Sequence, residues 1–175
     1  AARFLDLVYT NTFSALPLHR VRYGLMLRED GHVLYDGTTA RLGENHYLMT
    51  TTTAAAGLVM RHLDFVHQAF CADWDLRFIS VTEAWAQFAV AGPKARDLLN
   101  ATLDAPLPDV PFMGFAMVGV GGVAARLFRI SFSGEVGFEI AVPTRYGEAL
   151  FRDLMARAET MGGGPYGMEA LNVLR

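Results

Sequence analysis

The stretch Tyr23-Gly-Leu-Met-Leu-Arg-Glu-Asp-Gly-His-Val-Leu-Tyr-Asp36 predicts two β-strands joined by a tight turn. Apolar residues stand on both sides of the Asp30-Gly31 pair, which is typical of a β-hairpin. The second strand carries a carboxylate, Asp36, to a place where the apolar pattern predicts protein rather than water. Because a buried carboxylate without a partner is costly, Asp36 indicates a ligand site. The alternative is that Asp36-Gly37 forms a second turn that faces solvent.

Length and composition predict a globular protein with one sizeable core, or two lobes that share it. The 175 residues are 52% hydrophobic and 19% charged, which excludes a disordered chain. The net charge of −3, without a Lys/Arg cluster, argues against binding to nucleic acid or to a membrane surface. No apolar run is long enough to span a bilayer. The lone Cys71 excludes an intrachain disulfide and fits a reducing, cytoplasmic compartment.

Both ends of the sequence lie inside helical patterns. Residues 1–5 are already helical in pattern, with no initiator Met and no capping residue. Residues 170–175 are helical in pattern and have no Gly or Pro stop signal. We therefore expect a segment of a longer protein, truncated at both ends.

The order of predicted elements repeats along the chain with a shift of about ninety residues. Each half has a short amphipathic helix, then three strands, then a longer helix with an apolar stripe. The short helices are expected at 2–8 and 95–101, and the strands at 21–27, 33–41, 47–52, 115–120, 124–131 and 138–142. The stripes are Val59, Leu63, Val66 and Phe70 in the first half, and Tyr146, Leu150, Leu154 and Ala158 in the second.

This repeat predicts an α+β fold of two related lobes, each a mostly antiparallel sheet with helices packed on it. We expect the lobes to be residues 1–82 and 83–175, the first incomplete at its N-terminus and the second at its C-terminus. The second half has an extra strand at 85–91, followed by Gly92-Pro93 at the start of its helix. Symmetry predicts that the first lobe has lost such a strand and turn. Ligands tend to bind where such lobes meet.

A second informative stretch is Arg129-Ile-Ser-Phe-Ser-Gly-Glu-Val-Gly-Phe-Glu-Ile-Ala141. On a strand Phe138 and Ile140 point one way, and Glu139 points the other. An ionised Glu accepts hydrogen bonds with two oxygens, so it suits a planar ligand with two adjacent N–H donors. The amino-pyrimidinone edge of a pterin is such a ligand. The alternative is that Glu139 lies on the solvent face of a half-buried strand.

Together these segments resemble the folate-binding aminomethyltransferase family. That family includes the T-protein of the glycine cleavage system and related domains of sarcosine and dimethylglycine oxidases. The resemblance rests on the run 23–36, on the Gly-Pro-Lys-Ala junction within 88–95, and on the Gly-Glu-x-Gly-aromatic-Glu signature within 131–140. It covers nearly the whole chain. The sequences of residues 82–93 and 165–175 are most similar to the C-terminal part of the alpha subunits of heterotetrameric sarcosine oxidases.

The resemblance implies that tetrahydrofolate captures the one-carbon unit of sarcosine here, giving 5,10-methylenetetrahydrofolate. Asp36 matches the family's catalytic Asp, Glu139 its pterin-anchoring Glu, and Tyr23 its folate-contacting Tyr. The further folate contacts that the matched segments imply are Leu25, Met26, Thr51, Phe132 and Glu169. The implied partners are the other subunits of a sarcosine oxidase, with FAD, FMN and NAD held only in the rest of that complex. The isolated segment is expected to be inactive.

Three departures from the T-protein pattern leave other functions open. Phe132 replaces a Tyr, and Tyr35-Asp36 replaces two successive acids. An Arg that T-proteins use to bind folate corresponds to a position near Leu171 in this chain, where the polar residues close by are Glu169 and Arg175. The alternatives are a non-catalytic module that binds folate or a subunit, a scaffold that has lost its ligand, and a T-protein-like aminomethyltransferase.

Several other features predict structure rather than chemistry. Residues 119–123 resemble half a dinucleotide loop but have strands on both sides, which indicates a hairpin turn. His62 and His67 are five residues apart on one helix and do not share a face, so no metal site is expected. Trp85 is expected in the core. The threonines of 50–53 either cap the following helix or line the pocket.

Overall fold

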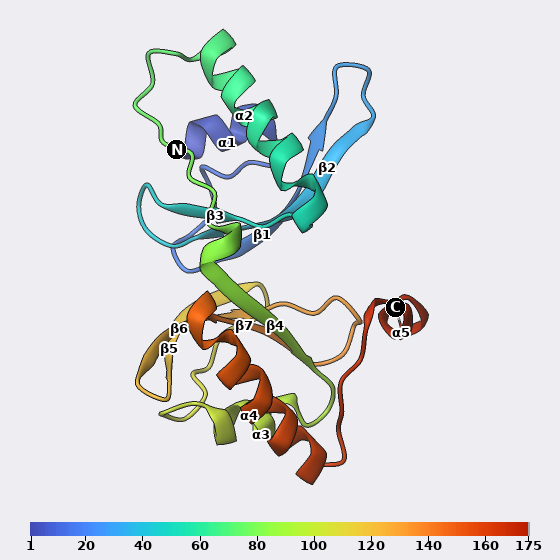
Figure 1. Cartoon of the computed structure of the whole chain (residues 1–175). Helices are drawn as coiled ribbons and strands as arrows, with labels where there is room; N and C mark the ends of the chain where they lie inside the picture. The colour runs from blue at the N-terminus through green and yellow to red at the C-terminus, as the bar shows by residue number, and fades with distance from the viewer. Residues whose placement is uncertain (175) are drawn as a thin grey trace. The chain divides into compact units, whose positions relative to one another are not determined.

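The computed structural model describes residues 1–174. The chain divides into two compact units, unit 1 (Ala1–Thr82) and unit 2 (Glu83–Arg175). Each unit has one antiparallel sheet with helices packed against it (Figure 1). The predicted α+β class with two sheet-and-helix lobes is therefore confirmed.

Unit 1 is a three-stranded antiparallel sheet in the order β1-β2-β3. Its elements are α1 (Ala2–Val8), β1 (Val21–Leu27), β2 (Val33–Arg41), β3 (Tyr47–Met49), a 3₁₀ turn (Thr53–Ala55) and α2 (Ala56–Phe70). The core lies between the helices and one face of the sheet. It includes Phe4, Leu5 and Val8 of α1, Met26 of β1, and Val59, Leu63 and Val66 of α2.

Unit 2 is a four-stranded antiparallel sheet in the order β4-β7-β6-β5, so β4 is an edge strand. Its elements are a 3₁₀ turn (Thr82–Ala84), β4 (Trp85–Ala91), α3 (Ala95–Thr102), β5 (Gly114–Val120), β6 (Val123–Arg129), β7 (Gly137–Pro143), a 3₁₀ turn (Thr144–Tyr146), α4 (Gly147–Thr160) and α5 (Met168–Leu174). The core includes Leu99 of α3, Leu150 and Leu154 of α4, and Phe138, Ile140 and Val142 of β7.

Three local predictions were wrong. The strand expected at 47–52 ends at Met49, although the Thr50 N–H still donates to Thr38 O of β2 at 2.8 Å. Phe70, expected in the buried stripe of α2, is the last residue of that helix and is 70% exposed. No Thr side chain caps α2 or the 3₁₀ turn before it.

The two units repeat a loop that precedes the first strand of a hairpin and is anchored by an arginine at the end of the second strand. In unit 1, the N–H of His19 donates to Arg41 O at 2.9 Å, and Arg41 Nη1 donates to Leu16 O at 2.7 Å. His19 has a positive φ of 60°. The counterparts in unit 2 are Met113 (φ 56°), whose N–H donates to Arg129 O at 2.9 Å, and Arg129 Nη1, which donates to Val110 O at 3.0 Å. These matched bonds support the repeat that the order of elements predicts.

Replacing this anchor should destabilise the protein. Arg129→Gln leaves the buried Val110 carbonyl without its charged donor, so we expect a loss of about 1–3 kcal/mol in the free energy of unfolding, measured by urea denaturation. The control is Arg152→Gln. Arg152 pairs with Glu148 on the exposed face of α4, and we expect a change within about 0.5 kcal/mol. An effect at Arg129 no larger than that at Arg152 would contradict the anchoring role.

Candidate functional site

Tyr23 and Asp36 lie together on one face of the unit 1 sheet. In the register of β1 and β2, Tyr23 pairs with Thr38 and Leu25 pairs with Asp36, so all four share a face. The Tyr23 hydroxyl donates to Asp36 Oδ2. This hydrogen bond raises the pKa of Tyr23, with smaller contributions from burial and from the charges of Asp36 and Tyr35. The pair presents a carboxylate held by a neutral phenol.

The prediction that Asp36 is buried was wrong, since its side chain is exposed. The alternative of a second turn at Asp36-Gly37 was also wrong, because both residues lie inside β2. The reason is a bulge. Leu27 pairs with Val33 but Met26 pairs with Tyr35, so Leu34 is the extra residue. A regular hairpin would place Asp36 opposite Gly24, on the face that packs on the core.

Leu25 and Met26 were both predicted to line the ligand, but they lie on opposite faces of β1. Leu25 is half-buried and shares the face of Asp36. Met26 is 0% exposed and belongs to the core of unit 1. We therefore leave Met26 out of the candidate site, because successive strand residues point to opposite sides of a sheet.

A pair of hydroxyls lies beside Tyr23. Thr38, directly opposite Tyr23 on β2, has its hydroxyl 2.6 Å from that of Thr50. Thr51, the threonine predicted as a folate contact, instead donates to Thr52 O at 2.9 Å. Thr38 was missed by sequence reasoning, although its spacing of two from Asp36 on one strand was the signal for it.

Glu139 is held on β7 in unit 2. Phe138 and Ile140, its neighbours on the strand, are 1% and 0% exposed in the core, so Glu139 points to the opposite face, as predicted. It is half-buried, and Gln87 Nε2 on β4 donates to its Oε2 at 2.7 Å. Burial raises the pKa of Glu139. One carboxylate oxygen is thus occupied by an amide, in a setting that favours further N–H donors.

Two residues that sequence reasoning did not assign to the site share this face with Glu139. Arg126 on β6 pairs with Ala141, and Trp85 on β4 pairs with Pro143, which places both on the side away from the helices. The guanidinium carbon of Arg126 lies 3.7 Å from the Trp85 ring centroid. Burial lowers the pKa of Arg126. Trp85 is half-buried and outside the core cluster, so the prediction of a core role was wrong.

The other predicted residues lie apart from these pairs. Phe132 is in the turn between β6 and β7 and is 56% exposed. Glu169 is exposed on α5, and Leu171 on the same helix is half-buried. Arg175 lies outside the described residues. The structure thus groups Tyr23 with Leu25 and Asp36 in unit 1, and Glu139 with Gln87 in unit 2.

The raised pKa of Glu139 makes a prediction about stability. A carboxyl whose pKa is higher folded than unfolded stabilises the fold below its ordinary pKa, and this contribution is lost as the pH rises through the raised value. Glu139→Gln cannot ionise, so it should flatten this loss of stability in urea denaturation at a series of pH values. Glu135→Gln, in the exposed turn before β7, is the control. An unchanged pH profile for Glu139→Gln would contradict the assignment.

Within residues 1–174, no three His, Cys, Asp or Glu side chains gather closely enough to hold a metal ion. In the same part of the chain, no helix combines the length and the apolar character that crossing a membrane requires.

The chain is similar to a known domain family and to sarcosine oxidase alpha subunits. Residues 1–175 match the model of the GCVT N-terminal domain family. The sarcosine oxidase subunit alpha of Rhizobium meliloti (strain 1021) is 50% identical over 179 residues, which cover 100% of this chain and 18% of that protein. The corresponding subunit of Corynebacterium sp. (strain U-96) is 41% identical with the same coverage. The chain therefore spans less than a fifth of the length of these relatives.

Aminomethyltransferases match at lower identity. That of Geobacillus sp. (strain WCH70) is 29% identical over 173 residues, which cover 98% of this chain and 46% of that protein. Among solved structures, the glycine cleavage system aminomethyltransferase T from Bartonella henselae superposes with a TM-score of 0.76 at 24% identity. The match covers 89% of this chain and 41% of that one, and it shows that the two share a fold.

Proposed function

Because this chain belongs to the GCVT N-terminal domain family, we propose that it is the folate-binding segment of a sarcosine oxidase alpha subunit. Its role there is to capture, on tetrahydrofolate, the one-carbon unit released by sarcosine oxidation, giving 5,10-methylenetetrahydrofolate. The observation that carries the proposal is the exposed Asp36 carboxylate, fixed by the Tyr23 hydroxyl, in a chain 50% identical to such a subunit. The other subunits are its partners, and FAD, FMN and NAD belong to the rest of the complex.

The residues of unit 2 fit the pterin end of a folate. Glu139 is half-buried, and its raised pKa records the cost of ionising it there. Two adjacent N–H donors on a flat ligand would offset that cost, because charge-assisted bonds to a carboxylate are strong ones. Gln87 engages only Oε2, which leaves Oε1 to accept a hydrogen bond. Glu139 thus binds and orients the ligand.

The residues of unit 1 fit the chemical step. When bound, tetrahydrofolate would supply the nitrogens that take up the one-carbon unit. Asp36 stabilises positive charge near those nitrogens and accepts the proton that is released. Tyr23 donates to Oδ2 and so holds the carboxylate in one orientation. Oδ1 is the oxygen that we assign to the proton transfer.

The comparisons favour this role over that of a T-protein-like aminomethyltransferase. Identity to the sarcosine oxidase alpha subunits is 41–50%, against 25–29% for the aminomethyltransferases. The alternative is a segment that binds folate or a subunit without catalysis. A binding measurement alone does not distinguish this alternative from the proposed catalytic role, but a measurement of product formation does.

The test uses the complete heterotetramer. We expect calorimetry to show binding of tetrahydrofolate by the complex, and sarcosine turnover with tetrahydrofolate present to yield 5,10-methylenetetrahydrofolate. Binding without product would indicate a module that only holds the vitamin. The absence of binding by the intact complex would contradict both roles and leave a scaffold that has lost its ligand.

A further inference from the structure

The outer edge of β4 carries backbone groups that have no hydrogen-bond partner within the described part of the chain. The Gly92 N–H donates to Val136 O at 2.9 Å. This bond shows which residues of β4 direct their N–H and C=O groups toward β7 and which direct them outward. In an antiparallel pair alternate residues bond inward and the others point outward, so Ala89 and Ala91 direct their N–H and C=O groups away from the sheet. Among residues 1–174, no group donates to or accepts from them.

The outer edges of β1 and β5, the other long edge strands, each accept a backbone hydrogen bond from a neighbouring loop. On β1, the Thr10 N–H donates to Leu25 O at 2.9 Å. On β5, the Asp104 N–H donates to Gly119 O at the same distance. Proteins commonly protect exposed edges with charged residues, proline or bulges. β4, which reads Trp85-Ala-Gln-Phe-Ala-Val-Ala91, has no charge and no proline, and its pairing with β7 is continuous.

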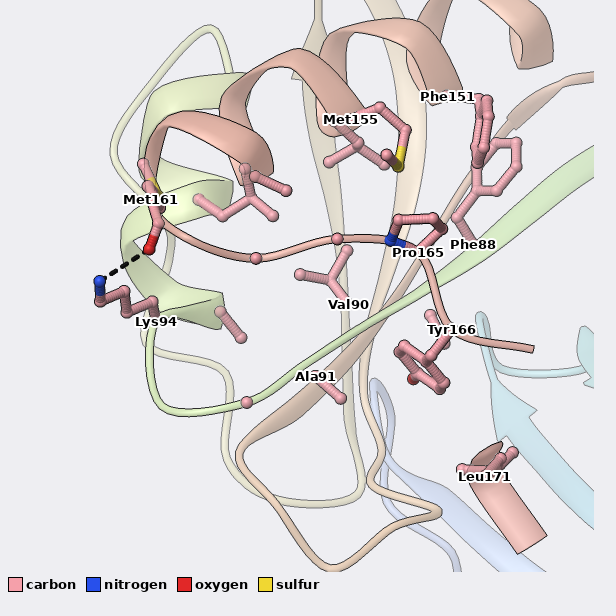
Figure 2. Close-up of a pocket in the computed structure, with 18 of the residues that line it drawn as sticks. Phe88, Val90, Ala91, Lys94, Phe151, Met155, Met161, Pro165, Tyr166 and Leu171 are labelled. Atoms are coloured by element: carbon pink, nitrogen blue, oxygen red, sulfur yellow. Dashed lines mark hydrogen bonds between the residues drawn. The ribbon is translucent and has the colours of Figure 1, made fainter. Parts of the chain in front are cut away.

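A cavity of about 600 Å³ lies along this edge (Figure 2). Its walls are β4, the start of α3, one side of α4 and the segment 161–168. The side chains that line it are mainly apolar, including Phe88, Val90, Phe151, Leu154, Met155 and Tyr166. Among the described residues that line it, Lys94 has the only charged side chain, and its Nζ donates to Met161 O at 2.7 Å at the end of α4. The cavity therefore offers backbone hydrogen bonds and apolar walls.

We propose that the outer edge of β4 takes up an extended, uncharged strand from the part of the parent alpha subunit outside residues 1–175. This inference rests on the proposed function. The matched region is 18% of the Rhizobium meliloti relative, so most of such a subunit lies outside it. A strand tethered in the same polypeptide docks at a high effective concentration. Among the described residues the lining has no acidic side chain, and its one cation, Lys94, already donates to Met161 O, so an uncharged segment fits these mainly apolar walls best.

The geometry also defines the pattern of the incoming strand. Its backbone would bond to Ala89 and Ala91, as in other cases of strand addition. Because side chains alternate, every second residue would enter the cavity beside Val90 and Phe151. We therefore expect apolar residues at alternate positions of that strand.

The test is amide hydrogen exchange of Ala89 and Ala91 in the complete alpha subunit. We expect both amides to exchange at least about 100-fold more slowly than in an unstructured chain, as backbone-bonded strand amides do. Exchange near the unstructured rate would overturn the proposal. Ala89→Pro removes one outward N–H, which an edge strand tolerates, and should accelerate exchange at Ala91. Ala89→Ser keeps the N–H and should not.

A photoreactive benzoylphenylalanine at position 151 identifies the occupant, since Phe151 lines the cavity and is 45% exposed. A cross-link to a segment of the same subunit outside residues 1–175 supports the proposal. Because segment 161–168 lines the same cavity, a cross-link to it is expected in any case; cross-links confined to that segment, or made to a second copy or to another subunit, overturn the proposal. Folate binding is measured on the same preparation. Protected amides without folate binding would contradict only the proposed function, and exposed amides with intact folate binding would contradict only this inference.

Discussion

Replacing Asp36 with asparagine should lower the rate of 5,10-methylenetetrahydrofolate formation by about 10²–10⁴-fold, the usual contribution of a positioned acid–base group. Asparagine keeps the shape of the side chain and can still accept from Tyr23, but it takes up no proton. Sarcosine oxidation should continue, because that reaction is assigned to another part of the complex. The measurement is product formation and sarcosine consumption by the same preparation of the heterotetramer.

The matched control lies on the same hairpin. Asp30→Asn makes the same change at the turn, where Asp30 pairs with Arg28 at 2.7 Å on an exposed surface. It should leave both rates unchanged. Tyr23→Phe keeps the ring and removes the hydroxyl that holds Asp36, so we expect a smaller loss of transfer than for Asp36→Asn. If Asp36→Asn transferred the one-carbon unit at the normal rate, the catalytic assignment would be wrong.

The second large effect concerns Glu139 and the affinity for tetrahydrofolate. Glu139→Gln replaces an acceptor-only carboxylate with an amide that presents one donor to the ligand's N–H groups. We expect the loss of charge-assisted bonds to weaken binding by about 1.5–3 kcal/mol, or roughly tenfold to more than a hundredfold. Calorimetry with the complete subunit measures the change. Glu135→Gln, in the neighbouring exposed turn, should bind normally.

The pH dependence separates this role from a structural one. If the ionised form of Glu139 binds the ligand, wild-type affinity should fall as the pH drops through the raised pKa of that carboxyl. Glu139→Gln should lose this dependence. Equal affinities for the two proteins across the pH range would contradict the anchoring role.

The sequence predicted the elements of the fold well, because periodicity is a local property. The apolar stripes placed α2 and α4, and the alternation around Glu139 correctly turned its side chain away from the core. The strand expected at 47–52 ends earlier than its local pattern predicts. Its contacts with β2 are non-local: a Cβ at Gly37 would collide with the Thr50 carbonyl, and the pattern of 47–52 does not encode this close approach.

The site was less predictable, because it depends on register. Asp36 and Glu139 stood out from their own segments, yet their neighbours come from other strands. Thr38 meets Tyr23, Gln87 meets Glu139, and Arg126 meets Trp85 only when the strands are paired. Sequence patterns give the face of each residue and say nothing of which residue stands opposite.

The extra residue at Leu34 has an evolutionary consequence. Losing that one codon would carry Asp36 to the side of the sheet that packs against Tyr9 and Phe13, where an unpaired carboxylate is costly. Restoring it would return the acid to the surface. In this hairpin, the insertion or deletion of a single codon therefore changes the face of the sheet on which the carboxylate lies. Relatives whose hairpin has a different length would need their acidic residue at a different position in the strand.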